Sequence, residues 1–89
     1  MLESEKSYRT GTLLGPMPYT AAQLGKLIRD TRKTLGVTQK DLALTSGTGI
    51  RFIIDLEKGK ETCEIGKALA VLRTLGIQLT LTPPAGAEK

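Results

Sequence analysis

The side chains of this chain that point most clearly to a chemical role are the basic ones of Lys and Arg. Their excess over acidic side chains lies in one segment. Residues 20–60 carry eight Lys and Arg against four Asp and Glu, which accounts for the whole net charge of +4. A positive segment of this kind favours a polyanionic partner such as nucleic acid. The 89 residues include no histidine and one cysteine, which excludes the usual zinc ligand sets and a disulfide framework. We therefore expect a nucleic-acid-binding protein with no enzymatic activity, metal or cofactor.

Arg51 has the side chain best able to read a DNA base, because a guanidinium can donate two hydrogen bonds to O6 and N7 of guanine. Ile50, Ile54 and Asp55 share the outward side of the same predicted helix and are further predicted base contacts. The two isoleucines could touch thymine methyl groups, and DNA shape could supply the remaining specificity. Two alternatives stay open: Arg51 could contact a phosphate, and Phe52 and Ile54 could cover the core or a partner protein.

A second set of polar and basic side chains could hold the DNA backbone. The predicted phosphate contacts are Gln39, Lys40, Arg29, Lys33, Lys58 and Lys60. Gln39 begins a predicted helix, whose free N–H groups attract phosphate, so it should contact a phosphate or clamp the turn beside one. Ordinary solvated charge is the alternative for the others, above all for Arg29 and Lys33.

Four predicted helices in residues 20–76 would position these side chains. A Thr-x-x-Gln capping box at Thr20 begins the first helix, and Gly36 ends it. The others are expected at about 39–45, 50–58 and 63–75, with Thr38 and Thr62 as caps of the second and the last. The predicted core positions are Leu24, Leu27, Ile28, Thr31, Leu35, Ile53, Leu56, Ile65, Ala68, Leu69, Leu72 and Leu75.

The two middle helices have the features of a helix-turn-helix unit, whose second helix enters the major groove of DNA. Ala43 allows the two helices to cross closely, and Gly47 suits a turn that needs a positive φ. Ile53 and Leu56 anchor the second helix of the pair to the core. Together these positions predict residues 20–76 as a DNA-binding domain.

Residues 24–59 resemble the XRE family of lambda repressor-like helix-turn-helix proteins. The similarity is carried by Leu24, Gly25, Ile28, Arg29, Arg32, Gly36, Thr38, Gln39, Leu42, Ala43, Gly47, Ile53, Glu57 and Gly59. The resemblance implies a mainly α protein, with a compact four- to five-helix lambda repressor-like DNA-binding domain. It also implies that Arg32 and Glu57 form a structural ion pair, so that neither is a base contact or a catalytic acid.

The C-terminal part changes to a period of two, in which Ile77, Leu79 and Leu81 alternate with polar residues before a Pro-Pro pair. A single strand at 77–82 leaves its backbone groups unpaired, so we expect it to pair with the same strand of a second copy in a homodimer. The alternative partner is residues 8–14 of the same chain. This tail resembles that of HipB-type antitoxins, whose dimers are closed by a strand from each subunit.

The two ends are expected to be flexible, in residues 1–19 with their glycines and prolines and in residues 83–89. No apolar run of 18 or more residues and no secretion signal is present, so we expect a cytoplasmic protein that does not contact a membrane.

The predicted function is a sequence-specific transcriptional repressor that binds an inverted repeat in double-stranded DNA as a homodimer. The resemblance to HipB-type antitoxins implies that the protein also represses its own operon and neutralises a HipA-like serine/threonine kinase. Two alternatives stay open: a stand-alone XRE-type regulator, and a helix-turn-helix used only as a protein-interaction module.

Overall fold

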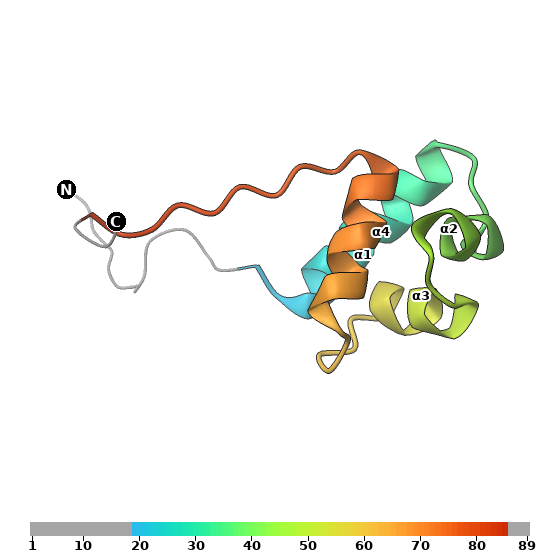
Figure 1. Ribbon diagram of the computed structural model, residues 1–89, viewed down its shortest axis with the longest axis horizontal. Helices are drawn as coiled ribbons and strands as arrows, with labels where there is room; N and C mark the ends of the chain where they lie inside the picture. Colours follow the sequence, from blue (N-terminus) through green and yellow to red (C-terminus); the bar gives the residue numbers. More distant parts are fainter. Residues whose placement is uncertain (1–18, 86–89) are drawn as a thin grey trace.

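Four helices form a bundle from which an extended C-terminal segment projects (Figure 1). The computed structural model describes residues 19–85. The helices are α1 (Ala21–Thr34), α2 (Gln39–Ser46), α3 (Ile50–Glu57) and α4 (Ile65–Leu75). α1 packs against α3 and α4, and α2 packs against the same two helices. The described part of the chain is therefore mainly α, as the sequence predicts, and none of its helices is long and apolar enough to cross a membrane.

Two of the predicted helix caps are present. The Gln23 N–H donates to Thr20 Oγ1 at 3.1 Å, and the Thr20 N–H donates to Gln23 Oε1 at 2.9 Å, which completes the capping box. Thr38 Oγ1 accepts from the Asp41 N–H at 3.0 Å and caps α2. These local signals confirm where the sequence places the first two helix starts.

The predicted cap of the last helix at Thr62 is wrong. α4 begins at Ile65 after Glu64, which makes no side-chain cap hydrogen bond. Gly59 has φ +85°, and a Cβ there would lie 2.7 Å from Ala22 Cα, so the chain leaves α3 in close contact with α1. Residues 61–62 then form a turn, and Cys63 packs against the core before the helix can start. Tertiary packing therefore delays the helix beyond its sequence signal.

The core is one cluster of buried apolar side chains from all four helices. Its members are Ile28, Leu42, Ala43, Ile53, Leu56, Ala68, Val71, Leu72 and Leu75. Six predicted core positions are among them, while Leu42 and Val71 were not among the predicted ones.

Three predicted core positions are wrong. Ile65 is 75% exposed because it is the first residue of α4, and Leu35 is 55% exposed because α1 has already ended at Thr34. Leu27 is also at the surface, since α1 turns the face with Gly25, Ile28 and Arg32 toward the core.

α1 and the end of α3 approach each other closely, and this contact determines how the two helices pack. A Cβ on Gly25 would collide with the Leu56 carbonyl oxygen and lie 2.8 Å from that of Glu57. Only glycine therefore allows α1 to lie directly against the last turn of α3. The contact brings Arg32, further along α1, within reach of Glu57.

Residues 77–84 are extended but form no strand in this single chain (Figure 1). The Ile77 N–H donates to the Leu72 carbonyl at 2.9 Å, and the Ile77 side chain packs against the core. Leu79 and Leu81 are exposed. The strand at 77–82 stays a prediction that requires a partner, and its alternative partner at 8–14 lies outside the described residues, as do most of the two predicted flexible ends.

Candidate nucleic-acid interface

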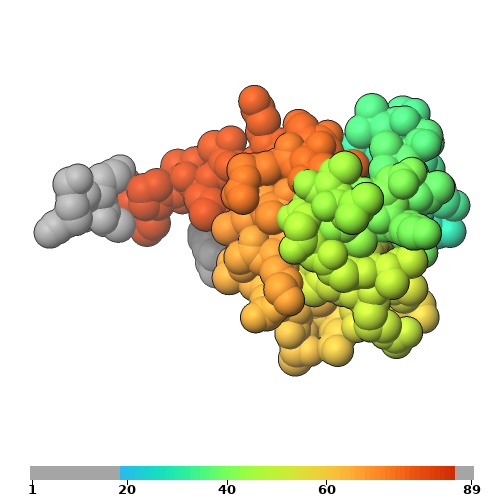
Figure 2. Space-filling model, turned by 45° about the vertical axis from the view of Figure 1, so that its right-hand side comes forward, coloured from blue at the N-terminus to red at the C-terminus, as the bar shows by residue number. Residues whose placement is uncertain are grey.

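α2 and α3 form a helix-turn-helix unit that covers one side of the bundle. Gly47 adopts φ 73° between them, and its N–H donates to the Leu44 carbonyl at 3.3 Å. Ala43 is buried where the two helices meet. In the space-filling view, α2 and α3 form a continuous surface from green to yellow, away from the C-terminal tail (Figure 2). This surface carries most of the predicted DNA contacts.

A buried ion pair ties α1 to the end of α3. Arg32 Nε donates to Glu57 Oε2 at 2.6 Å, and Arg32 Nη2 donates to Glu57 Oε1 at 3.1 Å. The two side chains are only 10% and 4% exposed. Arg32 Nη1 also donates to the Val37 carbonyl at 2.8 Å, which fixes the chain between α1 and α2. A two-point pair of this kind holds geometry as well as charge.

Gln39 joins the same hydrogen-bond network from the first residue of α2. Its Nε2 donates to Glu57 Oε1 at 3.1 Å, so the side chain clamps the turn onto α3. Of the two roles expected for Gln39, the clamp is thus the one present in the free protein. Of the first backbone N–H groups of α2, that of Asp41 is taken by Thr38 Oγ1, while those of Gln39 and Lys40 have no partner within the helix.

A hollow of about 450 Å³ lies where α1, α2 and α3 meet. Its lining consists of Arg29, Gln39, Ile54, Glu57 and Lys58. Arg29 and Lys58 are both exposed. Glu57 is neutralised by Arg32, and within residues 19–85 Arg29 and Lys58 have no acidic partner, so both cations face the hollow beside the start of α2.

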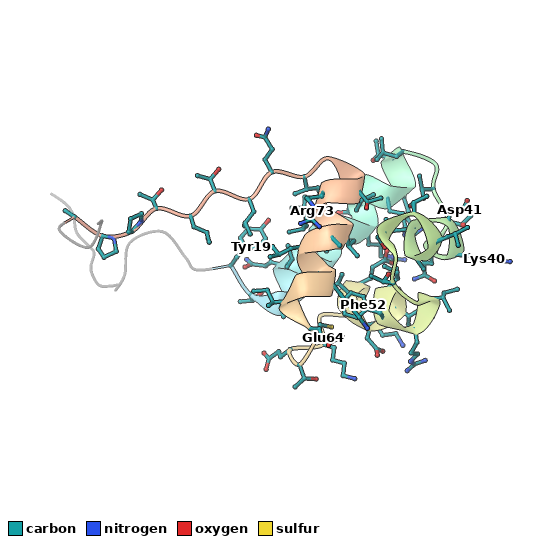
Figure 3. The ribbon with its side chains drawn as sticks, viewed as in Figure 1. Tyr19, Lys40, Asp41, Phe52, Glu64 and Arg73 are labelled. Atoms are coloured by element: carbon teal, nitrogen blue, oxygen red, sulfur yellow. The ribbon has the colours of Figure 1, made fainter. Side chains whose placement is uncertain are left out.

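The other predicted phosphate contacts are also exposed. Lys33 lies on α1, and Lys60 follows α3. Lys40 projects from α2 away from the bundle (Figure 3). Lys26, which was not among the predicted residues, donates to Asp30 at 2.7 Å. Its i,i+4 spacing was the signal that could have identified this pair.

The outer face of α3 carries the predicted base contacts. The Arg51 side chain is 78% exposed, whereas that of Asp55 is 18% exposed. Ile50 is exposed, and Ile54 is half-buried in the hollow described above. Phe52 packs against the core, and Lys67 Nζ lies 5.8 Å from its ring centroid (Figure 3). Phe52 therefore covers the core, which was one of its expected alternatives.

An electrostatic contact on the outer face of α1 changes the pKa of one acid. The hydrogen bond from Lys26 lowers the pKa of the Asp30 carboxyl, opposed by a weaker desolvation effect. The charges of Lys26, Arg29 and Lys33 act in the same direction as the hydrogen bond. The neighbouring cations of this helix thus stabilise the charged form of Asp30.

A second, apolar hollow of about 430 Å³ lies between α1, α4 and the extended tail. Tyr19 reaches into this region (Figure 3), and the lining residues used below are Leu24, Leu27, Leu72, Ile77 and Leu79. The predicted dimerisation residues Ile77 and Leu79 thus border it, while Leu81 lies further out and exposed. Sequence reasoning missed the hollow because Leu27 was assigned to the core.

The fold and this surface define a helix-turn-helix protein, and comparison with known proteins agrees. No family model matches the chain. The chain is 46% identical over 70 residues to y4mF of Sinorhizobium fredii, an uncharacterized helix-turn-helix-type transcriptional regulator, covering 79% of this chain and 92% of that protein. It belongs to the helix-turn-helix-type transcriptional regulators.

Several solved structures share the fold, and two of them illustrate the similarity. One is a chain of the HipA-HipB-O2-O3 complex, with a TM-score of 0.68, 23% identity, and coverage of 79% of this chain and 99% of that one. The other is the clp gene regulator ClgR from Corynebacterium glutamicum, with a TM-score of 0.61, 28% identity, and coverage of 72% and 82%.

Proposed function

We propose that this protein is a cytoplasmic, sequence-specific repressor that binds an inverted repeat in double-stranded DNA as a homodimer. The observation that carries the proposal is the guanidinium of Arg51, 78% exposed on the outer face of α3. In a helix-turn-helix unit this second helix is the one that enters the major groove. Placed there, Arg51 donates two hydrogen bonds to O6 and N7 of a guanine.

Apolar contacts supply the rest of the direct readout. Ile50 is the exposed residue at the start of α3, the end of a recognition helix that reaches deepest into the groove. Ile54 follows one turn later beside the hollow at α1. Both side chains can contact thymine methyl groups, which lie in the major groove.

The cations around α3 hold the phosphates on either side of that groove. Arg29 and Lys58 line the hollow beside the start of α2, where the helix dipole also favours an anion. Lys33, Lys40 and Lys60 extend the same positive surface. Gln39 contributes by clamping the start of α2 to Glu57 and so aims the free N–H groups of that helix.

The tail and the apolar hollow support a homodimer. Residues 77–82 alternate Ile77, Leu79 and Leu81 with polar residues and leave an extended backbone free to pair. Pairing with the same segment of a second copy satisfies those backbone groups. It also covers the hollow between α1 and α4, and two copies of α3 then read two half-sites.

The proposal extends to an antitoxin role in a HipBA-like pair. A chain with the same fold occurs in the HipA-HipB-O2-O3 complex, and the shared fold is the support for this step. The protein would then repress its own operon and inhibit a HipA-like serine/threonine kinase by contact. Reading the neighbouring gene tests this directly: a HipA-like kinase gene supports the antitoxin role, and its absence leaves a stand-alone regulator.

Selection of DNA from a pool of random duplexes tests the repressor proposal. We expect enrichment of an inverted repeat with half-sites about 34 Å apart. Arg51→Ala should lower affinity for the selected duplex roughly tenfold more than for a random duplex. Arg73→Ala is a matched control, since it removes the same charge from α4 (Figure 3). If no sequence is enriched, or if Arg51→Ala weakens binding to both duplexes equally, base reading by α3 is wrong.

A further inference from the structure

The Asp55 carboxylate lies within ion-pair distance of two cations on and just after α3, the helix that carries the predicted base contacts. Its Oδ1 lies 3.4 Å from Arg51 Nε, and its Oδ2 lies 3.5 Å from Lys60 Nζ. The Asp55 backbone carbonyl also accepts from the Lys60 N–H at 3.0 Å. Each carboxylate oxygen thus has a different cationic partner, and the Asp55 side chain is 18% exposed while Arg51 is 78% exposed.

This arrangement is poorly placed to stabilise α3 itself. Asp55 lies in the last turn of an eight-residue helix, where the dipole disfavours a negative charge. The pair also runs from base to acid along the helix, which is the weaker orientation for an i,i+4 pair. A pair whose cation is 78% exposed contributes little to stability. A role in orienting Arg51 accounts better for the position of the acid.

We propose that Asp55 is a positioning residue, which holds Arg51 for base reading and does not itself contact a base. The inference rests on the proposed DNA-binding function and changes the role expected for Asp55. With Nε beside the carboxylate, the planar guanidinium is biased toward orientations that leave its two terminal nitrogens free as a fork. That fork matches the two acceptors of guanine, and part of its rotational freedom is given up before DNA binds.

The negative charge of Asp55 also acts against binding at other sequences. A carboxylate at the rim of the groove repels phosphates and cannot accept a hydrogen bond from guanine O6 or N7. Arg51 is thereby kept from closing onto the nearest phosphate. Lys60 holds the second oxygen, so the carboxylate does not turn away from Arg51. Asp55 thus acts on specificity in two ways. It favours the contact of Arg51 with guanine, and it disfavours the contact of Arg51 with phosphates.

A double-mutant cycle on discrimination tests this role. The probes are the duplex that the wild-type protein selects, the same duplex with its contacted guanines replaced, and a random duplex. Asp55→Asn keeps the shape of the side chain and removes its charge. We expect its discrimination between selected and guanine-replaced duplexes to fall about fivefold, while affinity for the random duplex stays equal or rises. Glu64→Gln is the control, because it removes one negative charge at the start of α4 without touching Arg51.

The cycle separates positioning from other effects. In the Arg51→Ala background, Asp55→Asn should change discrimination no further, since the residue that it positions is gone. Circular dichroism melting checks that each variant is folded. Unchanged discrimination in Asp55→Asn, or an equal loss with and without Arg51, overturns the positioning role while leaving DNA reading intact. Absence of any selective binding by the wild-type protein overturns the proposed function, and the positioning role with it.

Discussion

Gln39 at the start of α2 donates a 3.1 Å hydrogen bond to Glu57 at the end of α3. Glu57 also receives Arg32 from α1, so one buried carboxylate connects three helices at the edge of the DNA-reading surface. The start of α2 faces phosphate in the proposed complex, and α3 faces bases. The Glu57 side chain, together with the core packing of α2 on α3, therefore sets the spacing between them. Stability and DNA binding should respond together when this carboxylate loses its partners.

Removal of the carboxylate should destabilise the fold strongly. Glu57→Ala leaves the guanidinium of Arg32 buried without its charge partner, which costs about 3–5 kcal/mol in the free energy of unfolding. Urea unfolding measures the change. Lys67→Met breaks the exposed pair with Glu64 as a control and should change stability by under about 1 kcal/mol. A loss in Glu57→Ala no larger than in the control would show that the buried pair does not hold the bundle.

Loss of Gln39 should have a smaller effect of the same kind. Gln39→Ala removes one neutral donor from Glu57 while Arg32 remains, so we expect about 1 kcal/mol of lost stability. Affinity for random DNA should also fall, because the start of α2 is less well fixed. Melting temperature and a mobility shift on the same preparation measure both. Full stability together with unchanged DNA affinity would exclude the clamp.

Glycine at position 25 should be essential for packing, whereas the one at position 66 should not be. In Gly25→Ala the new Cβ meets the carbonyls of Leu56 and Glu57, so α1 must move away, at a cost of about 1–3 kcal/mol. Gly66 lies near the start of α4 with open space around it, and Gly66→Ala should stabilise the protein by about 0.5 kcal/mol. Thermal unfolding of the two variants gives the comparison, and equal melting temperatures would contradict the close approach of α1 and α3.

The pair between Lys26 and Asp30 should give a small, acid-sensitive contribution to stability. The pKa of Asp30 lies below its usual 3.8, so the folded protein binds this proton less tightly than the unfolded chain does. The contribution is present above the unfolded pKa and is lost as pH falls through the lowered one. A carboxyl titration by NMR should give a higher midpoint for Asp30 in Lys26→Ala than in the wild type. Identical midpoints would show that Lys26 does not cause the shift.

The alternating tail should determine the oligomeric state. Substituting Leu79→Asp together with Leu81→Asp places charge on the apolar side of residues 77–82, and light scattering should then show a monomer where the wild type is a dimer. Thr80→Asp with Thr82→Asp adds the same charge to the other side and should leave the dimer intact. A dimer that survives both pairs of substitutions would exclude the tail as the interface.

Local cap signals predicted two of three helix starts, and apolar periodicity predicted six core positions. The caps at Thr20 and Thr38 depend on neighbouring residues alone, and both are present. Apolar periodicity misplaced Leu35 and Ile65 because it carries no information on where a helix ends within the packed bundle. The late start of α4 follows from the contact between Gly59 and Ala22, which are far apart in the sequence.

In the candidate site, too, some features could be predicted from the sequence and others depend on tertiary packing. The type of Arg51 and its place on the third helix were enough to predict it as a base reader, and its side chain is 78% exposed on α3. The i,i+4 spacing alone indicates the pair of Asp55 with Arg51. The contact of Asp55 with Lys60 depends on how the chain turns after α3, and no spacing rule gives it. The double role of Glu57, with Gln39 as well as Arg32, likewise follows from the packing of α2 on α3.

Methylation interference at guanine N7 tests most directly whether Arg51 reads a base in a dimeric complex. The selected duplex is methylated sparsely at guanine N7, bound to the protein, and the bound and free fractions are compared. We predict that methylation blocks binding at two symmetric positions about one helical turn apart, and that both signals disappear in Arg51→Ala but persist in Arg73→Ala. Interference that is absent in the wild type, or unchanged in Arg51→Ala, would contradict the reading of guanine by α3.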